Sequence, residues 1–217
     1  MQQLTDIMLE ILKFFYAVGG HNYGLAIIWL TIAVNIALYP LTLSSIQQMA
    51  AMQRLQPRIN EIQKKYKDEP AKLQKEMMDA YKTEGVNPLG GCLPVLLKIP
   101  IFLALFWALQ SKEFVQLAGQ NAPFIPGWIN NITVNDPWFI MPVLIGATTW
   151  LSQKSMPQTP GQSQAMMAFM PIFIAFISYN FAAGVQIYWI VSNLMGWAQQ
   201  SYIMAQKIKG RKTNEKN

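Results

Sequence analysis

The chain has 217 residues, of which 52% are hydrophobic and only 13% are charged, a balance that excludes an ordinary soluble domain and favours membrane-spanning helices. The formal net charge is +6. Cys92 is the only cysteine and His21 the only histidine, which excludes an internal disulfide and a Cys/His metal site. We therefore expect one all-α membrane domain over residues 1–217, with no metal and no cofactor.

The first predicted element is an amphipathic helix over residues 4–18. Its apolar residues recur at helical spacing, opposite Asp6, Glu10 and Lys13: Leu4, Ile7, Met8, Ile11, Leu12 and Phe15. This pattern predicts a helix lying in the membrane interface on the outer face, and the alternative is a short helix that packs on the rest of the protein. Because no basic leader with a cleavage site is evident, we expect no removable signal peptide.

Five hydrophobic runs free of Asp, Glu and Arg follow along the chain. They predict transmembrane helices over residues 23–43, 93–109, 137–151, 165–179 and 182–202. The third and fourth runs are only 15 residues long, which gives about 22 Å of helix against a hydrocarbon core of about 30 Å. We expect the bilayer to thin locally around these two helices.

Residues 44–85, between the first two runs, predict a cytoplasmic helical hairpin. Pro70 suits a first helical turn, and Pro57 is expected to kink or divide the first helix. One apolar stripe precedes Pro70 and another follows it: Ile46, Met49, Met52, Leu55, Ile59, Ile62 and Tyr66, then Leu73, Met77 and Tyr81. The two stripes can pack on each other, and their methionines can also contact varied apolar partners.

The distribution of lysine and arginine predicts the orientation. The segments 44–92 and 152–164 and the basic tail 206–217 contain nearly all of these residues, whereas the opposite side has only Lys13 and Lys112. Five spans then place the N-terminus outside and the C-terminus in the cytoplasm. Together these features predict a multi-pass protein of the bacterial plasma (inner) membrane.

Lys98 is the only charged residue in any of the five runs. A charge within the bilayer costs roughly 2.5–3.5 kcal/mol on insertion scales, so Lys98 either faces a polar interior or reaches back to the cytoplasmic surface. Thr31 and Asn35 are four residues apart and share a helix face, which predicts a polar seam. The alternatives are a bond from Thr31 to its own helix and an interhelical bond for Asn35.

Enzyme chemistry finds little support in the sequence. No span contains an acid or a histidine, which argues against a metalloprotease and against transport coupled to protons or cations, although a passive pore remains open. Lys98 with Ser192 could form a Ser-Lys pair, but no nucleophile turn surrounds the serine. We expect no enzymatic activity.

The basic tail contains the residues that could contact ribosomal RNA: Lys207, Lys209, Arg211 and Lys212. The alternative is an ordinary positive-inside anchor.

Several short strings resemble the YidC/Oxa-type membrane insertases, in order and over essentially the whole chain. They are Tyr39-Pro-Leu-Thr42, Leu55-Gln-Pro57, Asn87-Pro-Leu-Gly-Gly-Cys-Leu-Pro94, Pro100-Ile-Phe-Leu-Ala-Leu105, Asp136-Pro137, Phe169-Met-Pro171 and Ile190-Val-Ser-Asn-Leu194. The resemblance implies five spans around a hydrophilic groove open to the cytoplasm, and insertion and folding of new membrane proteins without bond chemistry. The large external domain of many Gram-negative members is expected to be absent.

The resemblance also implies partners and site residues. The implied partners are nascent membrane proteins, the ribosome, membrane lipids and, in some cases, the Sec translocon. The resemblance implies five groove residues: Lys98, Asn35, Thr31, Tyr188 and Trp189. We expect Gln186 and Ser192, polar residues of the fifth run, to line the groove as well. Asn35 stands where the family has its groove arginine, and Lys98 stands where it usually has a glutamine. Our hypothesis is that the groove cation has moved from the first span to the second. The alternative functions are a passive conduit or lipid scramblase, and a scaffold for another translocase.

Overall fold

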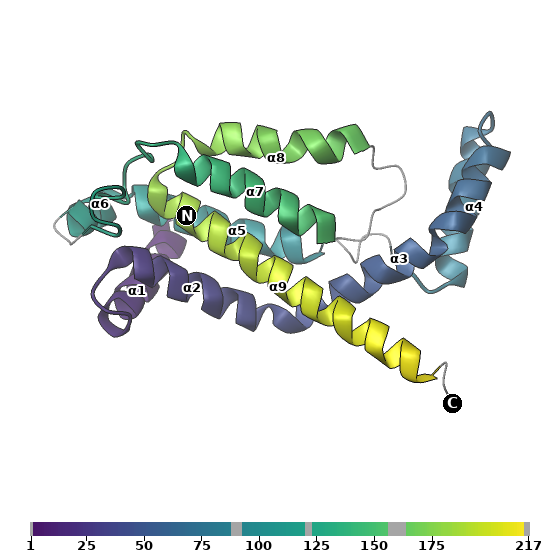
Figure 1. Cartoon of the computed structure of the whole chain (residues 1–217), viewed down its shortest axis with the longest axis horizontal. Helices are drawn as coiled ribbons and strands as arrows, with labels where there is room; N and C mark the ends of the chain where they lie inside the picture. The colour runs from purple at the N-terminus through teal and green to yellow at the C-terminus, as the bar shows by residue number, and fades with distance from the viewer. Residues whose placement is uncertain (1, 88–92, 120–122, 156–163, 215–217) are drawn as a thin grey trace.

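The computed structural model describes residues 2–87, 93–119, 123–155 and 164–214, and these residues are almost wholly helical (Figure 1). The helices are α1 (Gln2–Val18), α2 (Tyr23–Ala37), α3 (Tyr39–Lys65), α4 (Pro70–Thr83), α5 (Leu93–Gln110), α6 (Lys112–Gly119), α7 (Ile140–Ser155), α8 (Gln164–Ser178) and α9 (Ala183–Asn214). Within the described ranges, the only β-type pairing is an isolated bridge between Ile125 and Ile129. The structure confirms the all-α class.

Helix α9 lies at the centre of the bundle. It packs against α7 on one side and α2 on the other, while α8 packs mainly on α7, and α1 packs on α2 and α5 (Figure 1). The core between these helices is apolar, and its fully buried side chains include Leu12, Ile27, Leu105, Leu109 and Phe114. Hydrophobic burial therefore ties α1, α2, α5, α6 and α9 into one body.

Helix α1 has two apolar faces. Met8, Leu9 and Leu12 are buried in the core, whereas Ile7 and Phe14 are exposed. Part of the stripe predicted from the sequence therefore faces the protein, and part faces outward. The helix is a packing helix along its buried face, and its exposed face remains available for a membrane interface.

Lys13 joins α1 to α6. Its Nζ donates to Glu10 Oε1 and to Glu113 Oε1, each at 2.8 Å. These two hydrogen bonds, first to Glu10 and then to Glu113, raise the pKa of Lys13 above its usual range. The bond to Glu113 is an exposed contact between α1 and α6, and the buried ring of Phe114 anchors α6 in the core. The sequence pattern did not predict α6.

The expected continuous helix over 23–43 is interrupted at Leu38. Helix α2 ends at Ala37, and α3 begins at Tyr39 with Pro40 in its first turn. Pro40 has no N–H to donate to the carbonyl of Ile36, so one hydrogen bond needed to continue α2 is missing, whereas a proline fits the first turn of the next helix. Helix α3 then continues through Pro57 without ending there.

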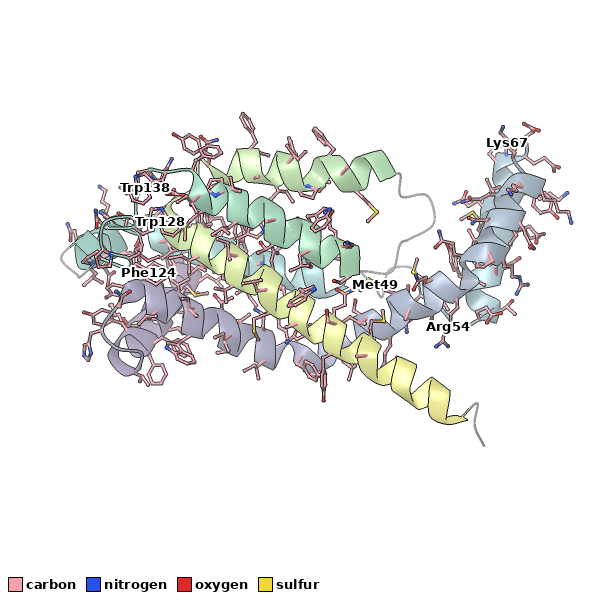
Figure 2. The ribbon with its side chains drawn as sticks, viewed as in Figure 1. Met49, Arg54, Lys67, Phe124, Trp128 and Trp138 are labelled. Atoms are coloured by element: carbon pink, nitrogen blue, oxygen red, sulfur yellow. The ribbon has the colours of Figure 1, made fainter. Side chains whose placement is uncertain are left out.

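Helix α7 begins at Ile140, three residues later than expected, because Asp136 caps it. The buried carboxylate of Asp136 accepts from the backbone N–H of Met141 at 2.6 Å, of Trp138 at 3.0 Å, and from Trp128 Nε1 at 2.7 Å. The rings of Trp128 and Trp138 are nearly parallel, with centroids 6.4 Å apart. Figure 2 shows the two rings together at the end of the bundle away from α4.

Helices α3 and α4 form a pair that projects from the other end of the bundle (Figure 1). The two apolar stripes meet in a small core, in which Leu55 and Ile59 from α3 contact Ala80 and Tyr81 from α4. Burial raises the pKa of the Tyr81 hydroxyl. Lys67 lies at the far tip of the pair (Figure 2).

Replacing Ile59 by Ala should loosen this pair selectively. Ile59 is fully buried in a cluster of few residues, so its truncation is expected to cost about 2–4 kcal/mol of the local opening free energy. Hydrogen exchange of the α4 amides measures this effect. Arg58→Ala is the matched control, because its ion pair with Glu84 is exposed and such pairs contribute about 0–1 kcal/mol. Equal protection of α4 in Ile59→Ala and the unaltered chain would contradict the assignment.

In the described part of the chain, no single helix is both long and apolar enough to cross a bilayer. Two helix pairs, each bent at a short break, meet that length and composition together: Gln3–Val18 with Tyr23–Ala37, at 110°, and Leu96–Gln110 with Lys112–Gly119, at 63°. Met167–Ser178 is a shorter apolar helix.

Candidate functional site

A cavity of about 320 Å³ opens between α5, α7 and α9. Helix α9 forms its floor, and α5 and α7 contribute one wall each. The lining residues are Lys98, Ile99, Phe102, Ser152, Tyr188, Trp189, Ser192, Asn193 and Gly196. The volume lies at the lower end of the range for small-molecule sites in proteins, so the cavity can hold a headgroup or a few side chains.

Lys98 lies on the α5 wall, and its side chain is directed toward α2. Its Nζ donates to Asn35 Oδ1 at 2.9 Å. Among the described residues, no carboxylate lies within ion-pair distance of this ammonium group. The cavity therefore contains a cation whose protein partner is a neutral amide.

Asn35 lies beneath Lys98 and not in the cavity wall. Asn35 is 1% exposed, and its Nδ2 donates to the backbone carbonyl of Thr31 at 2.8 Å. The backbone carbonyl of Asn35 accepts from Gln199 Nε2 at 3.1 Å. With its Nδ2 bonded within α2, the side-chain oxygen is left to accept from Lys98. The residue acts as an acceptor that holds the lysine and links α2, α5 and α9.

Thr31 and Gln186, two of the predicted groove residues, are not among the residues that line this cavity. The Thr31 hydroxyl donates to the carbonyl of Ile27 in its own helix at 2.6 Å. The Gln186 amide donates to the carbonyl of Ser178 at the end of α8, at 2.6 Å, and is fully buried. Both side chains bond backbone carbonyls locally, because a buried polar group away from water needs such a partner.

Aromatic rings form one side of the cavity. The centroid of the Phe102 ring lies 5.8 Å from that of Trp189 and 6.0 Å from that of Tyr188. Tyr188 and Trp189 therefore meet Lys98 around one space, and Ser192 lies one turn further along α9 in the same lining. Four of the seven predicted groove residues therefore line the cavity: Lys98, Tyr188, Trp189 and Ser192.

Two polar residues that the prediction omitted also line the cavity, Ser152 and Asn193. Asn193 donates to Thr149 Oγ1 at 2.9 Å, and Gln200, seven residues later, donates to the carbonyl of Ser155 at 2.7 Å. With Gln186 these amides repeat every seven residues, about two helical turns, and so they lie on one face of α9. Gln186 bonds α9 to the end of α8, and Asn193 and Gln200 bond it to α7.

The basic tail is described only as backbone. Helix α9 continues to Asn214, well beyond the expected span, and includes Lys207, Lys209, Arg211 and Lys212. Their side chains lie outside the described part of the structure.

The chemistry of the cavity is that of a binding site. It offers an ammonium group, hydroxyls and aromatic rings, which can hold an anionic or amphiphilic group. Over the described ranges, no group of three His, Cys, Asp or Glu side chains is placed to hold a metal ion.

Comparison with known proteins places the chain in a family. The family model described as "60Kd inner membrane protein" matches residues 14–211. The chain is 42% identical over 203 residues to "Membrane protein insertase YidC" of Cellvibrio japonicus, covering 93% of this chain and 36% of that protein. It is 44% identical over 191 residues to the protein of the same name from Aeromonas salmonicida, covering 87% and 34%. The chain thus spans about a third of the length of these curated relatives.

A solved structure shares the fold. The crystal structure titled "Active YidC insertase crystal structure with the first transmembrane domain resolved" superposes with a TM-score of 0.68 at 25% identity, covering 89% of this chain and 45% of that one. The family model, the curated relatives and the solved structure all point to one family, and so this chain belongs to the 60Kd inner membrane protein family, the YidC/Oxa1 family.

Proposed function

We propose that this chain inserts newly made membrane proteins into the bilayer and assists their folding. The observation that supports this proposal most directly is the cavity between α5, α7 and α9, with one cation opposite aromatic rings. Relatives named membrane protein insertase YidC support the same activity. No covalent bond is made or broken in the proposed process.

The proposed arrangement is multi-pass in the bacterial plasma membrane. Helices α2, α5, α7, α8 and α9 are the spans of a locally thinned bilayer, since none of them alone, over its described residues, is long and apolar enough for an unthinned one. The N-terminus is then outside and the C-terminus in the cytoplasm. The exposed apolar face of α1 lies in the outer interface, and the pair α3 and α4 projects into the cytoplasm. The cavity is then the hydrated groove, open toward the cytoplasm and the lipid.

Lys98 is the groove cation in this proposal. Its hydrogen bond to Asn35 supports the idea that the charge has moved from α2 to α5, because the two residues meet at one point. A carboxylate 4 Å from the ammonium group gains about 4 kcal/mol at an effective dielectric constant near 20, before desolvation. That attraction is enough to hold an acidic N-terminal tail transiently while the apolar segment enters the bilayer.

The proposed partners follow from the same arrangement. Nascent membrane proteins are the substrates, and ribosomes deliver them to the cytoplasmic side, where the basic tail and the pair α3 and α4 are available for docking. The Sec translocon is a partner for part of the substrates, and lipids surround the groove.

Crosslinking of a nascent single-span protein tests the proposal. A photoreactive phenylalanine analogue at Trp189 or Phe102 should crosslink to the translating substrate, because both side chains line the cavity. The same analogue at Trp29 or Trp150 is the control, since these residues are 49% and 52% exposed and lie outside the cavity. Equal crosslinking at all four positions would contradict a defined groove.

Vesicles containing only the purified chain separate insertion from the alternatives. Protease protection of an inserted substrate supports the proposal. Flux of ions or lipids without insertion would instead identify a passive conduit or a lipid scramblase.

A further inference from the structure

The charge of Lys98 lacks a counterion within the described protein. Its Nζ donates to Asn35 Oδ1, but an ammonium group has three donors and the amide oxygen neutralises none of its charge. Asp136, the buried acid of the bundle, is already bonded to Trp128 and to two backbone N–H groups at the start of α7. A charge held away from bulk water is stabilised by an anionic partner, and an anionic ligand in the cavity would supply one.

The cavity beside Lys98 continues onto an apolar outer surface. Ile99 lines the cavity and is also 45% exposed, and Leu96, about one turn earlier on the same side of α5, is 56% exposed. Phe102, one turn further along α5, extends the apolar lining inward. The cation therefore stands between a small cavity and a surface that fits hydrocarbon, which is the pattern that an amphiphile with a negative headgroup would match.

We propose that this site binds an anionic phospholipid, with its phosphate on Lys98 and an acyl chain along Ile99 and Phe102. The polar side of the headgroup meets the Ser152 and Ser192 hydroxyls across the cavity. This binding does not depend on insertase activity. It means that a lipid occupies the groove when no substrate is present, and that an acidic segment has to displace this lipid from Lys98.

Native mass spectrometry of the purified full chain tests the proposal. The probes are phosphatidylglycerol, phosphatidylcholine with the same acyl chains, and inorganic phosphate. We expect the unaltered chain to prefer phosphatidylglycerol over phosphatidylcholine by about tenfold, the effect of one charge-assisted contact. Lys98→Gln should abolish that preference and Lys98→Arg should retain it. Lys154→Gln is the matched control, because it removes a lysine that lies over the Trp150 ring and outside the cavity.

A second pair of variants gives an independent result if Lys98→Gln does not fold. Ser152→Glu adds an acid to the cavity wall and should lower binding of phosphatidylglycerol below that of Ser152→Gln, which removes the same hydroxyl and has a similar shape but no charge. Equal binding of both phospholipids by the unaltered chain, or an unchanged preference in Lys98→Gln or Ser152→Glu, would overturn the proposal. Inorganic phosphate binding as tightly as the lipid would show a site for free anions and would overturn it too, as would a site that takes an acidic peptide but no phosphatidylglycerol.

Discussion

Replacing Lys98 by Gln is expected to lower insertion of a single-span substrate with an acidic N-terminal tail by at least about tenfold. The variant removes the cation of the cavity while keeping a side chain that can still donate to Asn35 Oδ1. Insertion of a substrate whose acidic tail has been neutralised should change by less than about twofold, because that tail has no Coulombic attraction to the lysine. Protease protection after reconstitution measures both, and Lys154→Gln serves as the control for loss of one positive charge.

Moving the cation back to α2 should restore insertion. In the double variant Lys98→Gln with Asn35→Arg, the guanidinium replaces the lost charge within contact distance of residue 98. Asn35→Arg alone places two cations at the same point and is expected to insert poorly, because like charges at contact repel each other. Unchanged insertion of the acidic substrate by Lys98→Gln would refute the role of this lysine, whatever the double variant does.

Replacing Asp136 by Ala is expected to destabilise the protein by about 3 kcal/mol. The change removes a charged acceptor and leaves two backbone N–H groups and the Trp128 Nε1 without their partner. Thermal unfolding of the purified chain in one detergent measures the loss. Asp136→Asn, which keeps one acceptor oxygen, should lose only about 1 kcal/mol.

Asn135→Ala is the matched control for Asp136, because Asn135 is exposed and adjacent in sequence. It should leave the unfolding temperature unchanged. A loss in Asp136→Ala no larger than in Asn135→Ala would show that the cap does not hold the start of α7.

Apolar runs predicted most helices because each run has to be buried or face lipid along its whole length. The positions at which the helices begin and end were harder to predict from the sequence. The break at Leu38 was predictable from Pro40, because a proline lacks the N–H that a continuous helix over 23–43 needs at that position. The late start of α7 depends on Asp136, whose three partners come together only after folding.

The sequence predicted which polar and charged residues belong to the candidate site, but only partly which way their side chains point. Lys98 was conspicuous as a lone charge, and the structure brings it to Asn35, the position with which the resemblance had paired it. Helical spacing could not tell that Thr31 would bond its own helix or that Gln186 would face α8, because the rotation of each helix is set by packing. Ser152 falls one residue beyond the expected third span, and Asn193 was visible as a polar residue seven positions from Gln186.

The single-residue joint at Leu38 gives α3 the mechanics of a lever. Helix α3 has 27 residues, so it is an arm about 40 Å long that ends near Lys67, whereas Asn35 lies only about 4.5 Å from the joint. If α2 and α3 turn together about Leu38, a swing of about 9 Å at the tip displaces Asn35 by about 1 Å and multiplies the applied force in the same ratio. Such leverage on the acceptor that holds Lys98 requires α2 and α3 to stay rigid across Leu38 and α3 to leave its contacts with α5 and α9.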